Sequence, residues 1–191
     1  MKKLLYFTPL LLAFTACETD YGSYPAYSEN KQLQAVIEIP AGSAHVLKYN
    51  DSTQTFPAVK DAGQDKVIQY LPYPGNFGFI PSTRLGKENK FLPVLILGEA
   101  QETGTLMEIT PLGVLLLEEA GELEYKIIAV PAKPSQRLIV ATDYNELSEK
   151  YPSVKRILEL WFLHSEPANK AKIMGWKDER FAEELVQKWL K

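Results

Sequence analysis

Cysteine and histidine are nearly absent from this 191-residue chain, which has Cys17, His45 and His164 and no others of either type. So few side chains exclude a disulfide framework and a Cys/His zinc site. The sequence also shows no Ser–His–Asp arrangement and no glycine-rich loop of the type that cradles phosphates. A domain that begins after Cys17 would contain no thiol, so its stability must come from its hydrophobic core.

Excess positive charge is missing as well, since the formal net charge is −3. Loss of the first sixteen residues would also remove Lys2 and Lys3 and make the balance more acidic. Nucleic acid binding requires a basic face, so we expect no nucleic acid partner. After residue 16, no stretch approaches the ~20 apolar residues that a spanning helix needs.

The first residues are typical of a secretory signal. Lys2 and Lys3 precede a short apolar run, and Cys17 directly follows the small residues Thr15 and Ala16. A bacterial lipoprotein signal has this layout, with cleavage before the cysteine and acylation of its thiol. We therefore expect an exported bacterial lipoprotein, anchored to a membrane through Cys17, on a periplasmic or cell-surface face. An ordinary signal peptide with a coincidental cysteine is the alternative.

The chain then divides into a signal peptide at 1–16, a tether at 17–32 and a single domain at 33–191. The tether is polar with scattered glycine, proline and tyrosine, and we interpret it as a solvated linker. Packing of Tyr21, Tyr24 and Tyr27 on the domain surface is the alternative.

Between residues 33 and 131 the pattern is that of short β-strands rich in branched residues and bounded by glycine or proline. The predicted strands are 34–39, 46–49, 93–97, 106–109, 112–117 and 125–130. Their spacing predicts a closed or nearly closed barrel. Two prolines, two glycines and three aromatic residues in 71–80 predict a rigid turn that forms the wall of a site and leads into a strand.

After Pro134 the pattern becomes helical. Apolar residues at 154, 157, 158, 161 and 162 lie on one helical face, with Ser153 as the predicted cap. A last helix is predicted over 177–191. The expected architecture is a β barrel with helices packed outside it, a C-terminal helix among them.

Charged residues also occur inside predicted strands. Glu38 lies between Ile37 and Ile39, where either a solvent-facing acid or a site acid is consistent with the pattern. Lys48 and Lys126 lie among apolar neighbours in two further strands. Three such residues together favour a polar mouth to the barrel.

These segments, taken together, closely resemble the soluble inorganic pyrophosphatases of the single-barrel family (family I), from about Leu33 to Lys191. The segments that carry the resemblance are 36–41, 48–49, 73–80, 113–114, 121–122, 126–131 and 175–176. The resemblance implies a mainly β fold with α, a five-stranded OB-like closed barrel with helices outside. It also implies Mg²⁺-dependent hydrolysis of diphosphate to two phosphates, and it leaves a homo-oligomer open.

The same resemblance assigns roles to particular residues. It implies catalytic positions for Glu38, as an acid beside the metals, and for Tyr73, which would line the site. Substrate phosphates would be held by Lys48 and Lys126, and by Lys66 if it takes the place of the family's arginine. Glu119 and Glu124 fall where the family has metal-binding aspartates, whose side chains are one methylene shorter than those of glutamate.

The chain also departs from the family pattern. The family's Asp-x-Asp-Pro-x-Asp motif corresponds to the region around 87–94, where the last aspartate aligns with Pro93, which has no ligand atom. Ser165-Glu166 replaces a Tyr-Lys pair that grips phosphate, and Phe77 and Asn50 replace a tyrosine and a carboxylate. These changes predict an eroded metal site, because one well-placed electrostatic group is commonly worth ~10²–10³ in rate.

Three hypotheses follow. The first is a lipid-anchored family member that is weak or inactive and binds diphosphate or another small phosphate-like anion, or serves as an interaction module, with no Mg²⁺ retained. The second is an active diphosphatase with a site rebuilt around Glu38, Glu119 and Glu124. The third is a scaffold lipoprotein that uses only the barrel surface, for which the sequence offers no positive sign.

Overall fold

The computed structural model describes residues 19–86, 88–166 and 170–191. The predicted signal peptide and the predicted lipidation at Cys17 lie outside these ranges. Within them, the helices are too short or too polar to cross a membrane.

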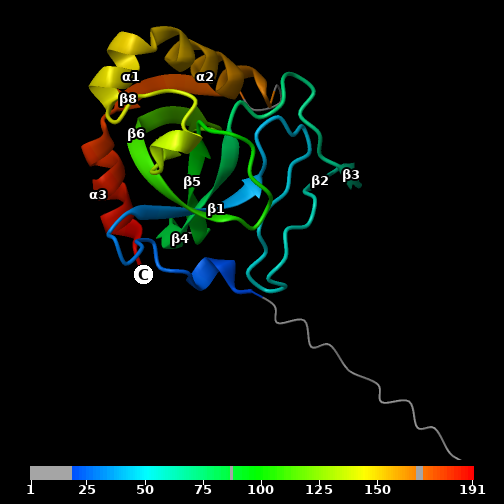
Figure 1. Ribbon diagram of the computed structural model, residues 1–191. Coiled ribbons are helices and arrows are strands. Elements are labelled where there is room, and N and C mark those ends of the chain that lie inside the picture. The colour runs from blue at the N-terminus through cyan, green and yellow to red at the C-terminus, as the bar shows by residue number, and fades with distance from the viewer. Residues whose placement is uncertain (1–18, 87, 167–169) are drawn as a thin grey trace, which may run out of the picture.

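Five strands close into a ring (Figure 1). They are β1 (Leu33–Ile39), β4 (Asn76–Leu85), β5 (Lys90–Ile96), β6 (Leu106–Glu119) and β7 (Glu122–Pro131). Their order is β1-β4-β5-β7-β6, and β6 pairs back onto β1, which leaves no free edge among them. All neighbours are antiparallel except the parallel pair β5 and β7. The ring confirms the predicted mainly β, OB-like fold.

The remaining strands lie outside the ring. β8 (Lys172–Lys177) pairs with β6, and β2 (Lys60–Asp61) and β3 (Gln64–Asp65) form a small hairpin. The strands expected at 106–109 and 112–117 are one strand, β6, whose register against β7 shifts between Pro111 and Gly113. The strand predicted at 46–49 is wrong, because this segment makes only isolated bridges, such as Leu47 with Ala58.

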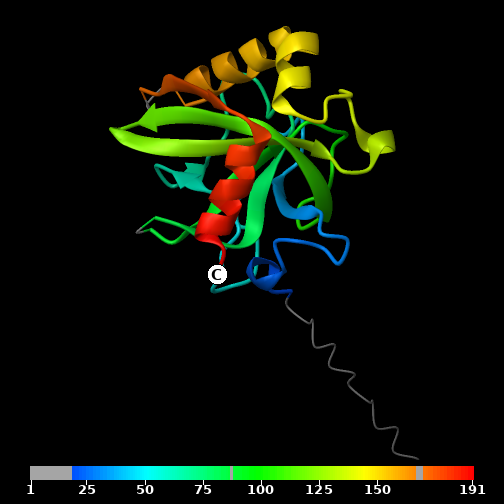
Figure 2. The ribbon, with the colours of Figure 1, turned by 90° about the vertical axis from the view of Figure 1, so that its left-hand side faces the viewer.

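In the described part of the chain, three α-helices cover the ring: α1 (Tyr144–Lys150), α2 (Pro152–His164) and α3 (Glu179–Trp189). α1 and α2 lie beside β8 at one end of the barrel (Figure 1), and α3 packs across the outside of the strands (Figure 2). The two predicted helices are present, but α2 begins at Pro152, so Ser153 is not its cap. Proline suits this first position because the N–H it lacks would have no partner inside the helix.

Both faces of the ring are covered by apolar side chains. Val94 packs in one cluster with Ala182 and Leu185 of α3, whereas its neighbour Leu95 packs in another with Leu158 of α2. Adjacent residues of a strand point to opposite faces, so β5 is buried on both sides. This explains why the strands read as nearly continuous apolar runs rather than as an alternating pattern.

The proline- and glycine-rich segment at 71–80 is explained by close packing. Gly78 lies opposite Ile37, and a Cβ at Gly78 would collide with the carbonyl oxygen of Val36. Asn76 is fully buried and accepts hydrogen bonds from the backbone N–H groups of Ala41 (3.1 Å) and Gln101 (2.8 Å). These two residues therefore hold the backbone in place, and the aromatic side chains of the segment, Tyr73, Phe77 and Phe79, line a pocket.

The segment from Asp20 onward packs on the domain, so the expectation of a solvated linker is wrong there. A carboxylate oxygen of Asp20 accepts a hydrogen bond from the Tyr49 hydroxyl (3.1 Å). The Tyr21 ring contacts those of Tyr49 and Phe56, with centroids 5.8 and 5.0 Å apart. A Cβ at the buried Gly22 would approach Asp51 to 2.8 Å. The tyrosines thus belong to the domain surface, while the boundaries 17–32 stay a prediction.

Candidate functional site

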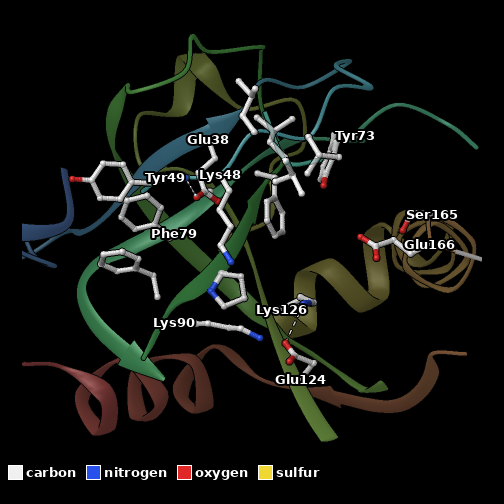
Figure 3. A pocket seen from close by; sticks show the side chains of 18 of the residues that line it. Glu38, Lys48, Tyr49, Tyr73, Phe79, Lys90, Glu124, Lys126, Ser165 and Glu166 are labelled. Carbon is white, nitrogen blue, oxygen red and sulfur yellow. Dashed lines mark hydrogen bonds and ion pairs between the residues drawn. The ribbon is translucent and has the colours of Figure 1, made fainter. Parts of the chain in front are cut away.

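A pocket of about 620 Å³ opens at one side of the barrel. Seven residues that the sequence singled out line it: Glu38, Lys48, Lys66, Tyr73, Glu119, Glu124 and Lys126. Figure 3 shows Lys48, Lys90 and Lys126 projecting into the same central space from different parts of the chain. The fold therefore brings together every predicted site residue within the described ranges, whereas their individual roles stay predictions.

Strand geometry accounts for the acidic end of the pocket. Glu124 and Lys126 lie two residues apart on β7, so their side chains emerge on the same face. Lys126 Nζ lies 3.3 Å from Glu124 Oε2. Glu119 lies at the end of β6, opposite Glu122 in the tight hairpin between β6 and β7. The hairpin turns at Ala120 and Gly121, both of which have positive φ.

Glu38 is the most deeply buried acid of the pocket, with 8% of its surface exposed. Its Oε1 accepts a hydrogen bond of 2.7 Å from the backbone N–H of Tyr49. Burial raises the pKa of Glu38 from 4.5 to about 7, although this hydrogen bond and the charge of Lys48 oppose the increase. A solvent-facing strand acid, the alternative left open by the sequence, is therefore wrong.

Three of the lysines that line the pocket form ion pairs with carboxylates that also line it. Lys66 Nζ lies 2.7 Å from Glu166 Oε1 at the end of α2, Lys90 pairs with Glu88, and Lys126 pairs with Glu124. The Glu88 partner raises the pKa of Lys90 and keeps it charged. Lys48 is different, because it has no ion pair with any residue in the described part of the chain.

Tyr73 lies across the pocket from Lys90 of β5 (Figure 3). Its ring packs on Trp161 of α2, with centroids 4.7 Å apart, and on Phe77 at 5.4 Å. Burial and the nearby Glu166 and Glu38 raise the pKa of its hydroxyl. Tyr73 therefore remains a neutral phenol at physiological pH.

The Mg²⁺ ions that the family resemblance implies would need oxygen ligands from the acids of the pocket. Mg²⁺ prefers an octahedral shell of oxygens, usually carboxylates and waters. Among the described residues no three acids, histidines or cysteines gather as a metal site. Glu88, Glu124 and Glu166 are held by lysines, and Glu38 has a pKa near 7. Glu119 lines the pocket without an ion pair in the described ranges, but it has no second free acid with which to hold a cluster of Mg²⁺ ions, so the described donor set does not fit one.

Pro93 and the acids upstream of the pocket contribute no ligand to it. Pro93 lines the pocket, so a side chain without a donor atom faces it. Asp61 and Asp65, the nearest acids upstream, belong to the exposed β2–β3 hairpin, where Asp65 pairs with Lys60, and neither lines the pocket.

Sequence reasoning missed part of the site. It predicted departures from the family pattern around 87–94 and at Glu166, but it did not identify Glu88, Lys90 and Glu166 as members of ion pairs inside one pocket. It placed Trp161 and Phe162 on the apolar face of a helix, whereas they also form part of the pocket wall. Helical spacing indicates that face, but it does not indicate that the face packs against Tyr73.

Fold and pocket together define a small OB-like barrel protein with a charged pocket at its side. A family model described as inorganic pyrophosphatase matches residues 35–191. An inorganic pyrophosphatase of Agrobacterium fabrum is 34% identical over 163 residues, which cover 81% of this chain and 85% of that protein. The chain therefore belongs to the inorganic pyrophosphatase family.

Solved structures agree. The crystal structure of inorganic pyrophosphatase from Thermus thermophilus matches with a TM-score of 0.74 and 26% identity, over 88% of this chain and 95% of that one. The structure of an inorganic pyrophosphatase from Neisseria gonorrhoeae matches with a TM-score of 0.72 and 25% identity, over 90% and 96% of the two chains.

Proposed function

We propose that this family member is an exported, lipid-anchored protein that binds diphosphate or a similar small anion through lysines, with weak or no Mg²⁺-dependent hydrolysis. One observation carries this proposal: three of the carboxylates that line the pocket, those of Glu88, Glu124 and Glu166, are paired with lysines that also line it. Each pair neutralises a carboxylate and places an ammonium group where a divalent cation would be repelled.

The chain's own side chains can still bind an anion. Lys48 reaches the centre of the pocket (Figure 3) and has no ion pair among the described residues. The ammonium groups of Lys66, Lys90 and Lys126 lie around the same space. Ammonium groups donate charge-assisted hydrogen bonds to phosphate oxygens. A phosphate-like anion would replace the water and the carboxylates that now contact these lysines.

A turnover assay tests the weak hydrolysis. A chain that starts at residue 18 keeps every described residue and is incubated with diphosphate and Mg²⁺, Mn²⁺ or Zn²⁺. We expect phosphate release well below ~1 s⁻¹, since enzymes commonly turn over at ~1–10³ s⁻¹ and loss of several electrostatic groups is costly. Calorimetry with Mg²⁺ should show no tight binding at several sites.

Turnover within the usual enzymatic range would reject the weak-hydrolysis proposal. It would favour the other hypothesis, a diphosphatase rebuilt around Glu38, Glu119 and Glu124. A Glu119→Gln variant then identifies the responsible acid, because Glu119 lines the pocket and has no ion pair in the described ranges.

The anchor has a separate test. Cells that express the full chain are labelled with a radioactive fatty acid, and we expect the label on the native protein and none on Cys17→Ala. A Thr8→Ala variant serves as the matched control and should keep the label, because it leaves the cysteine intact. An unlabelled native protein would reject the lipid anchor without affecting the anion-binding proposal.

A further inference from the structure

The pocket is considerably larger than inorganic diphosphate requires. Diphosphate has nine non-hydrogen atoms, which need at most ~270 Å³ even at the ~30 Å³ that a water molecule takes in the liquid. The pocket measures about 620 Å³, which lies within the range of sites for small organic ligands. More than half of it is therefore left for a second chemical group.

The part of the pocket beside α2 is aromatic. The rings of Tyr73, Phe77, Trp161 and Phe162 all line it. Their centroids are 5.4 Å apart for Tyr73–Phe77, 4.7 Å for Tyr73–Trp161 and 5.1 Å for Trp161–Phe162. Inorganic diphosphate has no apolar surface to place against this wall, so the wall is suited to a ligand with a flat apolar group.

The polar atom of Trp161 already has hydrogen-bond partners within the fold. Its Nε1–H lies within hydrogen-bonding distance of the backbone carbonyl oxygens of Leu71 (2.9 Å) and Pro72 (3.0 Å). The indole ring therefore contributes apolar surface to the wall. Tyr73 keeps one polar atom at the same wall, since its hydroxyl has no hydrogen bond to any residue that the structure describes. A ligand can accept a hydrogen bond there.

Lys90 and Lys126 lie across the pocket from Tyr73 (Figure 3), whereas Lys66 pairs with Glu166 just after α2. We propose that the natural ligand is an organic phosphate or diphosphate ester with a flat apolar substituent. Its phosphate binds Lys48 and the neighbouring ammonium groups, and its substituent packs on Tyr73, Phe77 and Trp161. This inference rests on the proposed anion binding and names the ligand class of the same pocket.

Phenyl phosphate, methyl phosphate and inorganic phosphate are the probes, titrated by calorimetry in the presence of EDTA. All three carry a phosphate group, and only phenyl phosphate carries a ring. We expect phenyl phosphate to bind on the order of 10-fold tighter than methyl phosphate, because the ring buries apolar surface. It should also change the fluorescence of Trp161, a change that Trp161→Phe abolishes.

Variants of the wall sharpen the comparison. Phe77→Ala should reduce the preference for phenyl phosphate to less than about 3-fold while inorganic phosphate still binds. Phe77→Leu is the milder variant if the alanine variant unfolds, and it should give an intermediate preference. Leu138→Ala, at an exposed residue outside the pocket, should keep the full preference.

The outcomes separate this inference from the proposed function. Equal affinity for phenyl and methyl phosphate, with inorganic phosphate and diphosphate still bound, would overturn the organic ligand and leave anion binding intact. No binding of any of these anions would overturn both. A preference that persists unchanged in Phe77→Ala and Phe77→Leu would also overturn the assigned wall.

Discussion

Titration of Glu38 is expected to lower the free energy of unfolding by about 3 kcal/mol as the pH rises, and replacing Glu38 with glutamine should remove this decrease. The native pKa of Glu38 is about 7, against 4.5 for an unperturbed glutamate. This difference is about 2.5 pKa units, each worth ~1.36 kcal/mol. Because Glu38 is deeply buried, screening by solvent reduces the effect little.

The sign follows from proton binding. Between pH 4.5 and 7 the folded protein keeps a proton on Glu38 that the unfolded chain has lost. The free energy of unfolding therefore falls as pH rises through this window. Below the window both states are protonated, and above it the folded state contains a buried charge that opposes folding. Glutamine cannot ionise, yet its carbonyl oxygen still accepts the hydrogen bond from Tyr49.

Urea unfolding at pH 4, 5, 6, 7 and 8 measures the effect as the difference in unfolding free energy between the native protein and Glu38→Gln. Glu183→Gln is the matched control, since Glu183 is exposed on α3, and its difference from the native protein should stay nearly constant. Parallel curves for the native protein and Glu38→Gln would contradict a raised pKa.

Lys48→Met is expected to weaken metal-free binding of diphosphate by ~10–10²-fold. A hydrogen bond to a charged group contributes about 1.5–3 kcal/mol, and each 1.4 kcal/mol corresponds to tenfold in affinity. Lys48 is expected to contribute more than the other lysines of the pocket because no described residue forms an ion pair with it. Lys90→Met should cost less, since Glu88 already neutralises Lys90.

An opposite effect is expected at the other side of the pocket. Glu166→Gln removes the carboxylate that pairs with Lys66, so it should strengthen diphosphate binding several-fold. Phosphorus NMR titration in EDTA measures all these variants, and Lys133→Met is the surface control, as Lys133 does not line the pocket. Equal losses in Lys48→Met and Lys133→Met would show that the pocket does not bind the anion.

Much of the fold could be read from the sequence because its signals are local. Short runs of branched residues indicate β1, β5 and β7, and the apolar face of α2 recurs with the period of a helix. The strand predicted at 46–49 failed because Lys48 and Tyr49 follow this pattern but lie in a loop that makes only isolated bridges. Residues 172–177 were missed because β8 depends on pairing with β6, which a local pattern does not contain.

The predicted site residues were found through a combination of motifs, and all of them within the described ranges line one pocket. The ion pairs were not found. Lys66 and Glu166 are 100 residues apart in the chain, yet their charged atoms lie 2.7 Å apart. No periodicity relates such positions, because the pairing arises only when α2 packs against the barrel. The same packing places Trp161 against Tyr73.

The sequence by itself determined the barrel, the family and the identity of the residues at the site, since these depend on residue types at characteristic spacings. It also predicted that Pro93 and Glu166 depart from the family pattern. Only the tertiary structure decided that lysines pair with Glu124 and Glu166, that Glu38 is buried with a raised pKa, and that Tyr73 packs on Trp161 in the pocket wall. Charge pairing and burial depend on distances across the fold, and residues distant in the sequence set those distances only after the chain has packed.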